Sequence, residues 1–573
     1  MALHQLNGKG ALGCFYEEAF QKELWEAVRT EKAYAPLFGA LLEDYRAVSR
    51  EGPVSAVRFS EYIIYRETGC RQNYEALYFA RRKRLNTYAL MALIYPEEEE
   101  HLLQLQDTIW AICDEYTWAL PAHIAWKTGR DPGNVDLFSA ETGFALSTIY
   151  HLLGGRLHEK VKERIDWELG RRIIRPFLRR SFWWERSNNN WAAVCAGSVG
   201  CAFLLRRPHL FPLIRPRIAF AMSRFLSGFP ADGICAEGVD YWNYGFGFFT
   251  VYARLLREFT HGRKDYFKRP KVREIAEFYQ KISLGGGVTV SFSDGGQHGR
   301  YYPGLLSFLR EEYPDVIGPL PPASRMLHDH CYRFCLELDC FLYNSLQEEN
   351  LALGEMTYYA PESAWLTRRT ASYGFAAKGG SNNVSHNHND IGSFIVARGG
   401  RQLLCDLGPG EYVKDYFNDQ KRYQYFCTSS RGHSVPVING QLQGHGAKYN
   451  SVSAWKDGVF TIEMAQAYRI PGVESVKRSF RPEAEKIVLT DQISGTVTSL
   501  KERFVTQVEP VAEGNVVRVG SLLMRPLGET GAPEIVQEPF QNHFSQEETV
   551  YCIDFDVPGK AFALELLMSE SEG

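Results

Sequence analysis

The chain has 573 residues, of which 45% are hydrophobic and 23% are charged, as is usual for a soluble globular protein. Its length predicts two to four domains. The net charge of −4 gives no general attraction to nucleic acid, so a polyanionic partner would need a local basic patch. No window approaches the roughly 18 uninterrupted apolar residues of a membrane span, and we expect neither a nucleic-acid nor a membrane partner.

The first ten residues lack the apolar segment of a signal peptide. The 12 cysteines are scattered, and several lie in apolar helical contexts. This is typical of reduced, buried thiols in a cytosolic protein rather than of a disulfide framework. We therefore expect a cytoplasmic protein. A secreted or periplasmic protein whose leader had been removed would have the same features.

Residues from about 14 to 340 have the apolar periodicity of helices. Between His101 and Tyr116, apolar side chains recur at spacings of three and four, which places them on one helix face. Clusters of Pro and Gly separate this segment from the next ones. We expect roughly ten to twelve helices, arranged as a hairpin array or a toroid. Further predicted helices are 138–153, 192–205, 246–259 and 272–284.

The pattern changes near residues 340–370, after which β-branched and aromatic runs alternate with polar residues. Many short strands separated by turn residues indicate antiparallel sheets, most simply a sandwich. We therefore predict a multidomain α+β protein with a helical domain over residues 1–345 and an antiparallel β-sandwich over residues 346–573. The predicted strands are 371–377, 391–397, 401–406, 434–438, 458–465, 486–493, 501–508, 549–555 and 561–567.

Two histidines, His386 and His388, precede the strand-like segment 391–397. Residues i and i+2 of a strand point to the same face, so we expect both side chains in one site. Asp406 ends one further β-rich segment and His433 begins another. A His/Asp/His set from neighbouring strands suits Zn²⁺, which accepts imidazole nitrogen and carboxylate oxygen. Surface histidines beside turns are the alternative.

Two stretches of the helical half place polar side chains at helix ends. Trp118 and His123 lie near the Pro-broken end of one predicted helix, and residues 136–142 open another with an acidic turn. Helix capping and core packing are the alternative for both stretches, and for the second they explain the pattern as well as a binding site does.

Three asparagines stand directly before Trp191. Asn is poor inside helices and favoured at caps, so one of them is expected to cap the helix 192–205. One cap needs one Asn, and the excess indicates amide donors directed into a cleft.

Residues 232–245 combine a Gly-rich turn, carboxylates and three aromatic rings at the start of a helix. Tyr241 and Tyr244 are three residues apart and therefore share a helix face, so both can line one cavity. Simple aromatic packing is the alternative.

These motifs resemble those of the heparinase II/III-like family of polysaccharide lyases. Single motifs are weak, but five occur in order between residues 75 and 445. The resemblance implies an (α/α) toroid followed by a β-sandwich, and elimination across the C4–O4 bond of a uronic acid. The motifs are NNW at 189–191, EGxxYWxYG at 237–245, HxHxDxGSF at 386–394, DLG at 406–408 and RGHSVPVING at 431–440.

The expected reaction explains why these residue types are needed. The C5 proton is barely acidic, so amide or imidazolium donors must offset the neighbouring carboxylate while a base removes the proton and an acid protonates O4. The resemblance implies Tyr244 as the catalytic tyrosine, with Tyr241 as the second choice. It implies that Asn189 or Asn190 contacts the substrate carboxylate. It leaves His386 as base or as the group that neutralises the carboxylate.

The resemblance also implies that His388, Asp406 and His433 bind a zinc ion, which pins the loop of His386 and is structural. Arg82 would bind the polyanion, although a solvated basic helix face explains it equally well. The remaining candidates for the substrate cleft are Trp118, His123, Trp191, Glu237, Tyr241 and Trp242.

We expect an acidic polysaccharide or oligosaccharide as substrate, first a glycosaminoglycan such as hyaluronan, chondroitin or heparan sulfate, and second alginate. A homodimer is left open. One alternative is a toroid glycoside hydrolase, which needs two carboxylates such as Glu141 and Glu237 with Asp136 or Asp240. The other is a catalytically inactive carbohydrate-binding relative.

Overall fold

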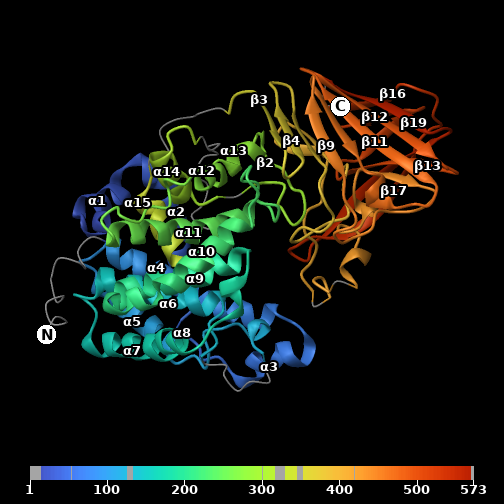
Figure 1. Ribbon diagram of the computed structural model, residues 1–573. Helices are drawn as coiled ribbons and strands as arrows, with labels where there is room; N and C mark the ends of the chain where they lie inside the picture. Colours follow the sequence, from blue (N-terminus) through green and yellow to red (C-terminus); the bar gives the residue numbers. More distant parts are fainter. Residues whose placement is uncertain are drawn as a thin grey trace.

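The computed structural model describes residues 15–52, 54–125, 133–299, 301–316, 330–344, 353–413, 415–418 and 420–569. Figure 1 shows a helical body formed by the first half of the chain and a body of β-sheets formed by the second. This confirms the predicted order of helices and antiparallel sheets. None of the helices within the described ranges has the length and apolarity needed to cross a bilayer.

The helical body contains α1 (Lys22–Thr30), α2 (Ala35–Arg50), α3 (Phe59–Thr68), α4 (Gln72–Ile94), α5 (Glu99–Cys113), α6 (Leu137–Leu153), α7 (Glu159–Leu169), α8 (Arg175–Arg179), α9 (Asn190–Arg206), α10 (Phe211–Ser227), α11 (Val239–Phe259), α12 (Pro270–Ala276), α13 (Phe278–Ile282), α14 (Pro303–Glu312) and α15 (Phe334–Leu342). The predicted helices at 101–116, 138–153, 192–205 and 246–259 are confirmed as α5, α6, α9 and α11.

The predicted helix 272–284 is wrong at its end. The segment forms the short helices α12 and α13, and then the chain enters a hairpin of β1 (Ser283–Gly285) and β2 (Val288–Thr289). The turn between the strands uses Gly286 and Gly287, both at positive φ, which L side chains rarely adopt.

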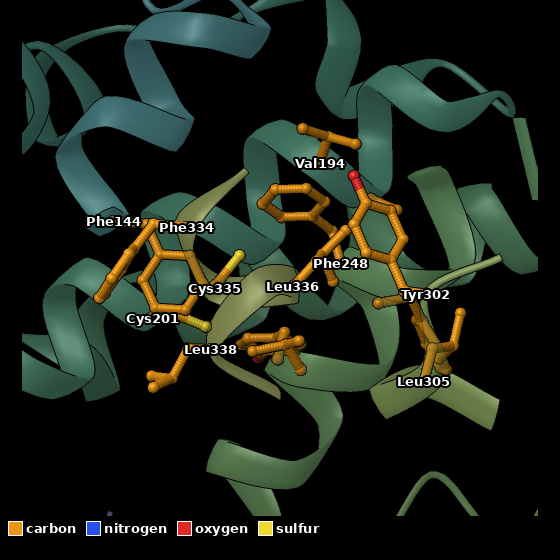
Figure 2. Packing of buried hydrophobic residues seen from close by; sticks show 14 of the residues in the cluster. Phe144, Val194, Cys201, Phe248, Tyr302, Leu305, Phe334, Cys335, Leu336 and Leu338 are labelled. Carbon is orange, nitrogen blue, oxygen red and sulfur yellow. The ribbon is translucent and has the colours of Figure 1, made fainter. Parts of the chain in front are cut away.

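Helix α9 lies in the centre of the helical body, packed against α6, α10 and α11. Its sequence is rich in Ala, Gly, Cys and Ser, which lets neighbouring helices approach closely. A Cβ at Gly200 would lie 2.7 Å from the ring of Tyr252 on α11. Figure 2 shows part of this core, where Val194 and Cys201 of α9 lie near Phe144 and Phe248. The packing fixes the N-terminus of α9, which carries the asparagine motif.

The sheet body contains β3 (Met356–Ala360), β4 (Trp365–Arg369), β5 (Gly374–Lys378), β6 (Phe394–Arg398), β7 (Arg401–Leu404), β8 (Pro436–Ile438), β9 (Val452–Lys456), β10 (Val459–Glu463), the helical turn α16 (Ala465–Tyr468), β11 (Val473–Pro482), β12 (Lys486–Gly495), β13 (Leu500–Thr506), β14 (Pro510–Glu513), β15 (Val516–Val519), β16 (Leu522–Pro526), β17 (Glu534–Gln541), β18 (Glu547–Val557) and β19 (Ala561–Met568). The nine predicted strands coincide with β5, β6, β7, β8, β10, β12, β13, β18 and β19.

Three antiparallel sheets make up this body. Their strand orders are β3-β4-β5-β6-β7, β17-β18-β13-β8 and β14-β15-β16-β19-β12-β11-β10-β9. Phenylalanine rings from different sheets meet in the common core: Phe394 of β6 lies 5.1 Å from Phe480 of β11 and 6.1 Å from Phe504 of β13.

A buried guanidinium ties this core to two loops that carry candidate site residues. Arg478 of β11 is fully buried and forms ion pairs with Asp491 and Glu502. Its Nη1 also donates to the carbonyls of Gly392 and Ser434, at 2.9 and 2.7 Å. A buried charge is costly unless such partners surround it. The two carbonyls follow the HxH motif and His433, so Arg478 helps to hold both loops in place.

Three glycines meet where the helical body joins the sheets. A Cβ at Gly238 would lie 2.6 Å from the Cα of Gly295, and a Cβ at Gly408 would lie 2.3 Å from the carbonyl oxygen of Gly295. Both Gly238 and Gly408 also have positive φ. This close approach explains the glycines of the EG and DLG motifs, and it brings the start of α11 beside the Asp406 loop.

The predicted domain boundary, at residues 345 and 346, lies outside the described residues. Helix α15 ends at Leu342 and β3 begins at Met356.

Candidate active site and metal centre

A cleft of about 910 Å³ lies between the helical body and the sheets. The helical body contributes residues 188–190, 227–230, 235–237 and 241 to its lining, and the sheet body contributes residues 361–365, 378–381, 383–385 and 450–453. A second cavity, of about 1060 Å³, is lined by residues of α2, α4 and α5 and by the chain before α3. It holds none of the predicted catalytic or metal-binding residues.

Tyr241 and His386 come from opposite sides of this junction and touch. Tyr241 lies in the first turn of α11 and lines the cleft. His386 follows Ser385, which also lines the cleft, and its side chain is 18% exposed. The two ring centroids are 4.5 Å apart. The site therefore needs both halves of the chain.

The prediction that His386 and His388 share one face of a strand is wrong. The HxH motif lies in the loop between β5 and β6, and β6 begins only at Phe394. His386 has φ +55°, a left-handed conformation that strands do not contain. Both rings nevertheless reach one place, because both bind the carboxylate of Asp294.

Asp294 lies at the centre of this site and is fully buried. Its Oδ2 accepts from Nδ1 of His386 at 2.5 Å, and its Oδ1 accepts from Nε2 of His388 at 3.1 Å. Tyr412 and Tyr416 donate their hydroxyls to it at 3.0 and 2.9 Å. Burial favours the neutral acid, but hydrogen bonds from the histidines outweigh it and hold the pKa of Asp294 well below its usual value.

Asn189 and Asn190 both line the cleft but have different partners. Asn189 is the N-cap of α9: its side-chain oxygen accepts from the backbone N–H of Trp191 at 3.2 Å. This is the cap that the sequence predicts for one asparagine. Asn190 is 8% exposed, and within the described residues its side-chain amide has no hydrogen-bond partner. The amide of Asn190 is therefore available to a ligand.

His388, Asp406 and His433 converge as a buried group, with one ligand atom of each lying within 4.8 Å of the others. Nδ1 of His388, Oδ2 of Asp406 and Nδ1 of His433 are buried and form no hydrogen bond, although the last two lie 3.2 Å apart as an ion pair. Unpaired buried polar atoms are costly, and a cation would satisfy all three at once. The set of two imidazoles and one carboxylate fits Zn²⁺.

The surroundings of these ligands support the same assignment. Nε2 of His433 donates to the carbonyl of Cys427 at 2.7 Å, and Nε2 of His388 donates to Asp294, so each Nδ1 keeps its lone pair. Burial lowers the pKa of His388, which favours the neutral imidazole. Burial raises the pKa of Asp406, but His433 more than offsets this and keeps the carboxylate ionised.

Removing one ligand should remove the metal. We expect His388→Ala to lose bound zinc and to unfold at a lower temperature, because an ion that binds only the folded chain stabilises it. The wild type should contain about one zinc per chain by metal analysis. His209→Ala, which alters an exposed histidine, is the matched control and should keep the metal. Less than half an equivalent in wild-type protein purified without chelator would contradict the site.

Three residues predicted to bind substrate are buried away from the cleft. Trp118 and Trp242 are fully buried, and their indole N–H groups donate to the backbone carbonyls of Ile112 and Ile275. Arg82 is buried against Glu115, to which it donates at 2.8 Å, and its guanidinium covers the ring of Tyr78. All three are core residues of the helical body.

The other predicted substrate contacts lie in or near the cleft. Glu237 lines it. His123 and Trp191 are partly exposed, with ring centroids 4.9 Å apart, and Trp183 lies 4.7 Å from Trp191. These rings do not line the cleft, but Trp191 directly follows Asn190, which does.

Tyr244 lies apart from His386, inside the helical body. Its hydroxyl donates to Glu141, and the guanidinium of Arg333 lies 3.5 Å from the centre of its ring. Arg333 binds both oxygens of Glu141 at 2.6 and 2.7 Å. Burial raises the pKa of Tyr244 well above its usual value. The two tyrosines of the motif thus point to different places.

Sequence reasoning did not find Asp294, Tyr412, Tyr416 or Arg422, whose guanidinium lies 3.3 Å from Asp294. A carboxylate in the polar, Gly-rich run Ser293–Gly296 gives a weak signal for Asp294. The sequence around Tyr412 and Tyr416 gives no such signal, because Asp294, to which both donate, is more than a hundred residues away.

Comparisons with known proteins bear on the fold that carries this site. Residues 356–555 match the family model described as Heparinase II/III-like, C-terminal. No curated protein matches the chain significantly. The solved structure of a heparan sulfate lyase HepC mutant from Pedobacter heparinus is 13% identical, with a TM-score of 0.62 over 96% of this chain and 91% of that one.

Two further structures extend the comparison. A crystal structure of heparinase III is 13% identical, with a TM-score of 0.63 over 99% of this chain and 93% of that one. The Streptomyces coelicolor A3 chondroitin AC lyase, solved with chondroitin sulphate, is 11% identical, with a TM-score of 0.54 over 97% of this chain and 83% of that one. The predicted (α/α) toroid followed by a β-sandwich is thereby confirmed. Residues 356–555 therefore resemble the C-terminal part of the heparinase II/III-like family, and the whole chain shares the fold of the solved heparinase structures.

Proposed function

We propose that this protein is a polysaccharide lyase that cleaves uronic-acid-containing polysaccharides or oligosaccharides by β-elimination. One observation carries the proposal: Tyr241 and His386 lie ring against ring where the toroid meets the sandwich, beside a cleft that also holds the unpartnered amide of Asn190. A phenol, an imidazole and an amide are the groups that this elimination needs.

The surroundings of the two rings suggest their roles. Burial and the nearby Asp294 carboxylate raise the pKa of Tyr241 well above its usual value, so its phenol stays protonated and can act as an acid. His386 donates from Nδ1 to Asp294, so Nε2 carries the lone pair and can act as a base. We therefore assign the acid role to Tyr241, the second choice from the sequence, and the base role to His386.

Tyr241 and His386 together account for every proton transferred in the elimination. Nε2 of His386 takes the proton from C5, the C5–H electron pair forms the C4=C5 double bond, and the C4–O4 bond breaks. Tyr241 gives its phenolic proton to the leaving O4. The proton held by His386 can then return to the tyrosinate, because the rings are adjacent.

The amides of Asn190 and Asn189 would offset the substrate carboxylate, whose charge grows as C5 loses its proton. If they act mainly on the transition state, Asn190→Ala should lower kcat by about tenfold to a hundredfold and change KM less. Steady-state kinetics measure both constants. A change confined to KM would show that Asn190 only binds the substrate.

His388, Asp406 and His433 would hold a zinc ion whose contribution is structural: it neutralises the buried ligands and fixes the loop that presents His386. No part of the elimination needs it as a Lewis acid, since Tyr241, His386 and the amides supply the acid, the base and the charge stabilisation.

The solved neighbours include heparan sulfate and chondroitin lyases by their names, which supports a glycosaminoglycan as the first choice of substrate. Alginate is the second. The charged side chains that line the cleft are Glu237, Glu362 and Lys378, and Lys378 is paired with Asp390 at 2.7 Å. Sulfate groups need clustered Arg or Lys, which this lining does not offer.

This charge pattern predicts how rate depends on sulfation. Chemically desulfated chondroitin should be cleaved at least about tenfold faster, by kcat/KM, than the same polymer with its sulfates, because each sulfate would approach Glu237 and Glu362 without a compensating cation. Equal or faster cleavage of the sulfated polymer would contradict the prediction. Asn383→Arg, which adds a cation on the exposed rim, should narrow the difference, while Asn383→Gln should not.

A glycoside hydrolase is less well supported. Of the four carboxylates that the sequence offered for it, Glu141 is bound by Arg333, and Asp136 caps α6 and binds His123. Only Glu237 lines the cleft. Product analysis separates the two reactions, because a lyase leaves a C4=C5 double bond and a hydrolase does not. Binding of uronate polymers without any product would indicate the inactive relative.

A further inference from the structure

Asp294 is shared between the two histidines of the HxH motif. It belongs to the turn after β2 of the helical body, whereas His386 and His388 belong to the sheet body. One carboxylate oxygen, Oδ2, accepts from His386, and the other, Oδ1, accepts from His388. Each oxygen also accepts one tyrosine hydroxyl, from Tyr412 and Tyr416 respectively.

These bonds set the orientation of both imidazole rings. His388 is held through Nε2, so its Nδ1 is left for the group that it forms with Asp406 and His433. His386 is held through Nδ1, so its Nε2 remains free to accept a proton. One carboxylate therefore gives two neighbouring histidines opposite tautomers and different tasks.

We propose that Asp294 is a positioning residue that couples occupancy of the divalent-cation site to the orientation of the base His386. The proposal rests on the lyase function proposed above. A cation on His388 fixes that imidazole against Oδ1, and the fixed carboxylate then holds Oδ2 against His386. The cation thus affects turnover through Asp294 although it does not touch the substrate.

The geometry requires a carboxylate at this position. Two imidazole N–H groups need two acceptor oxygens, and an amide offers only one. In Asp294→Asn the amide NH₂ would face one of the two imidazole N–H donors. That histidine would then lose its hydrogen-bond acceptor, or its ring would flip. The isosteric change also leaves the volume of the buried site intact, which makes it a sharper test than a truncation.

The first experiment measures kinetics and zinc affinity in Asp294→Asn. We expect kcat to fall by about 10²- to 10⁴-fold while KM changes less than about threefold, as when an oriented base loses its carboxylate partner. Zinc affinity, measured by competition with a chromophoric chelator, should weaken by about 10- to 100-fold. A folded Asp294→Asn with both kcat and zinc affinity within about twofold of wild type would overturn the proposal.

A second measurement tests the coupling without that variant. Removal of zinc from the wild type by a chelator should lower kcat more than it changes KM, and added zinc should restore it. An apo wild type that is folded and keeps its full kcat would overturn the coupling. In the double variant, the effects of His388→Ala and Asp294→Asn on kcat should be less than multiplicative, because both break the same connection. Multiplicative effects would also overturn it.

The matched control is Asp339→Asn, which removes another buried carboxylate, paired with Arg254 at 2.7 Å in the toroid. It should lower thermal stability but leave zinc affinity unchanged. An equal loss of zinc affinity in this control would assign the effect of Asp294→Asn to general destabilisation. The zinc measurement needs no turnover, so it tests Asp294 even if no uronate polymer is cleaved, a result that would count against the lyase function instead.

Discussion

Replacing Tyr241 with Phe is expected to lower kcat by about 10³-fold while KM changes less than about threefold, since the variant lacks only the proton that the leaving O4 needs. The phenol is the group that touches His386, and burial keeps it protonated. The variant also loses the hydrogen bond between the hydroxyls of Tyr241 and Tyr412, whose oxygens are 3.1 Å apart. We expect this loss to leave the fold and the metal unchanged.

The matched variant is Tyr244→Phe, three residues further along the same helix. Its hydroxyl binds Glu141 inside the toroid, so its loss should cost about 1.5–3 kcal/mol of stability, as for other hydrogen bonds to charged groups, and lower kcat by less than about tenfold. The opposite pattern, in which Tyr244→Phe abolishes turnover and Tyr241→Phe does not, would return the catalytic role to Tyr244, as the family resemblance implies.

Replacing His386 with Ala is expected to lower kcat by about 10³-fold or more, because no other base touches Tyr241 in the described part of the site. The side chain is partly exposed, so added imidazole should enter the space left behind and restore part of the activity. Zinc content should stay at the wild-type level, since His386 is not among the three converging ligands.

The comparison with His388→Ala makes this prediction specific. His386→Ala should lower turnover without loss of the metal, whereas His388→Ala, two residues along the chain, should remove the metal. Both variants would be assayed for zinc by metal analysis and for kcat on the same polymer. Zinc loss in both, or more than a tenth of wild-type activity in His386→Ala, would contradict the division of roles.

The convergence of His388, Asp406 and His433 could be predicted from the sequence, but not for the reason first given. The i, i+2 spacing of the two histidines suggests a strand, whereas the motif is a loop with His386 at positive φ. The loop is held by Asp294, which is 92 residues from His386, and by Arg478, which is 86 residues from Gly392. Such long-range partners leave no local pattern in a single sequence.

The direction of two buried indole side chains was also beyond the sequence. Trp118 and Trp242 belong to motifs with aromatic and polar residues, which are typical of a sugar-binding cleft as well as of a core. Each instead directs its indole N–H to a backbone carbonyl. Trp118 lies in the bend after α5, and α11, which carries Trp242, is buried over most of its length, so apolar periodicity does not show which side chains meet the cleft.

Strand β11 was not predicted, because a charged side chain hides its alternation of apolar and polar residues. In β11 the inward positions are Val476, Arg478, Phe480 and Pro482, and the inward arginine makes the segment read as polar. Strand β12, its partner, has the regular inward series Ile487, Leu489, Asp491 and Ile493, and was predicted. The buried ion pair of Arg478 with Asp491 joins the two, which is a tertiary contact that pattern reading does not see.

The central claim is that this cleft performs β-elimination on a uronate. The direct test is to incubate the purified protein with hyaluronan, chondroitin, heparan sulfate and alginate and to follow the ultraviolet absorbance of the C4=C5 double bond that conjugates with the carboxylate. We predict an increase with at least one polymer, greatly reduced in Tyr241→Phe. Chain shortening without that absorbance would indicate a hydrolase, and no product from any polymer would contradict the lyase function.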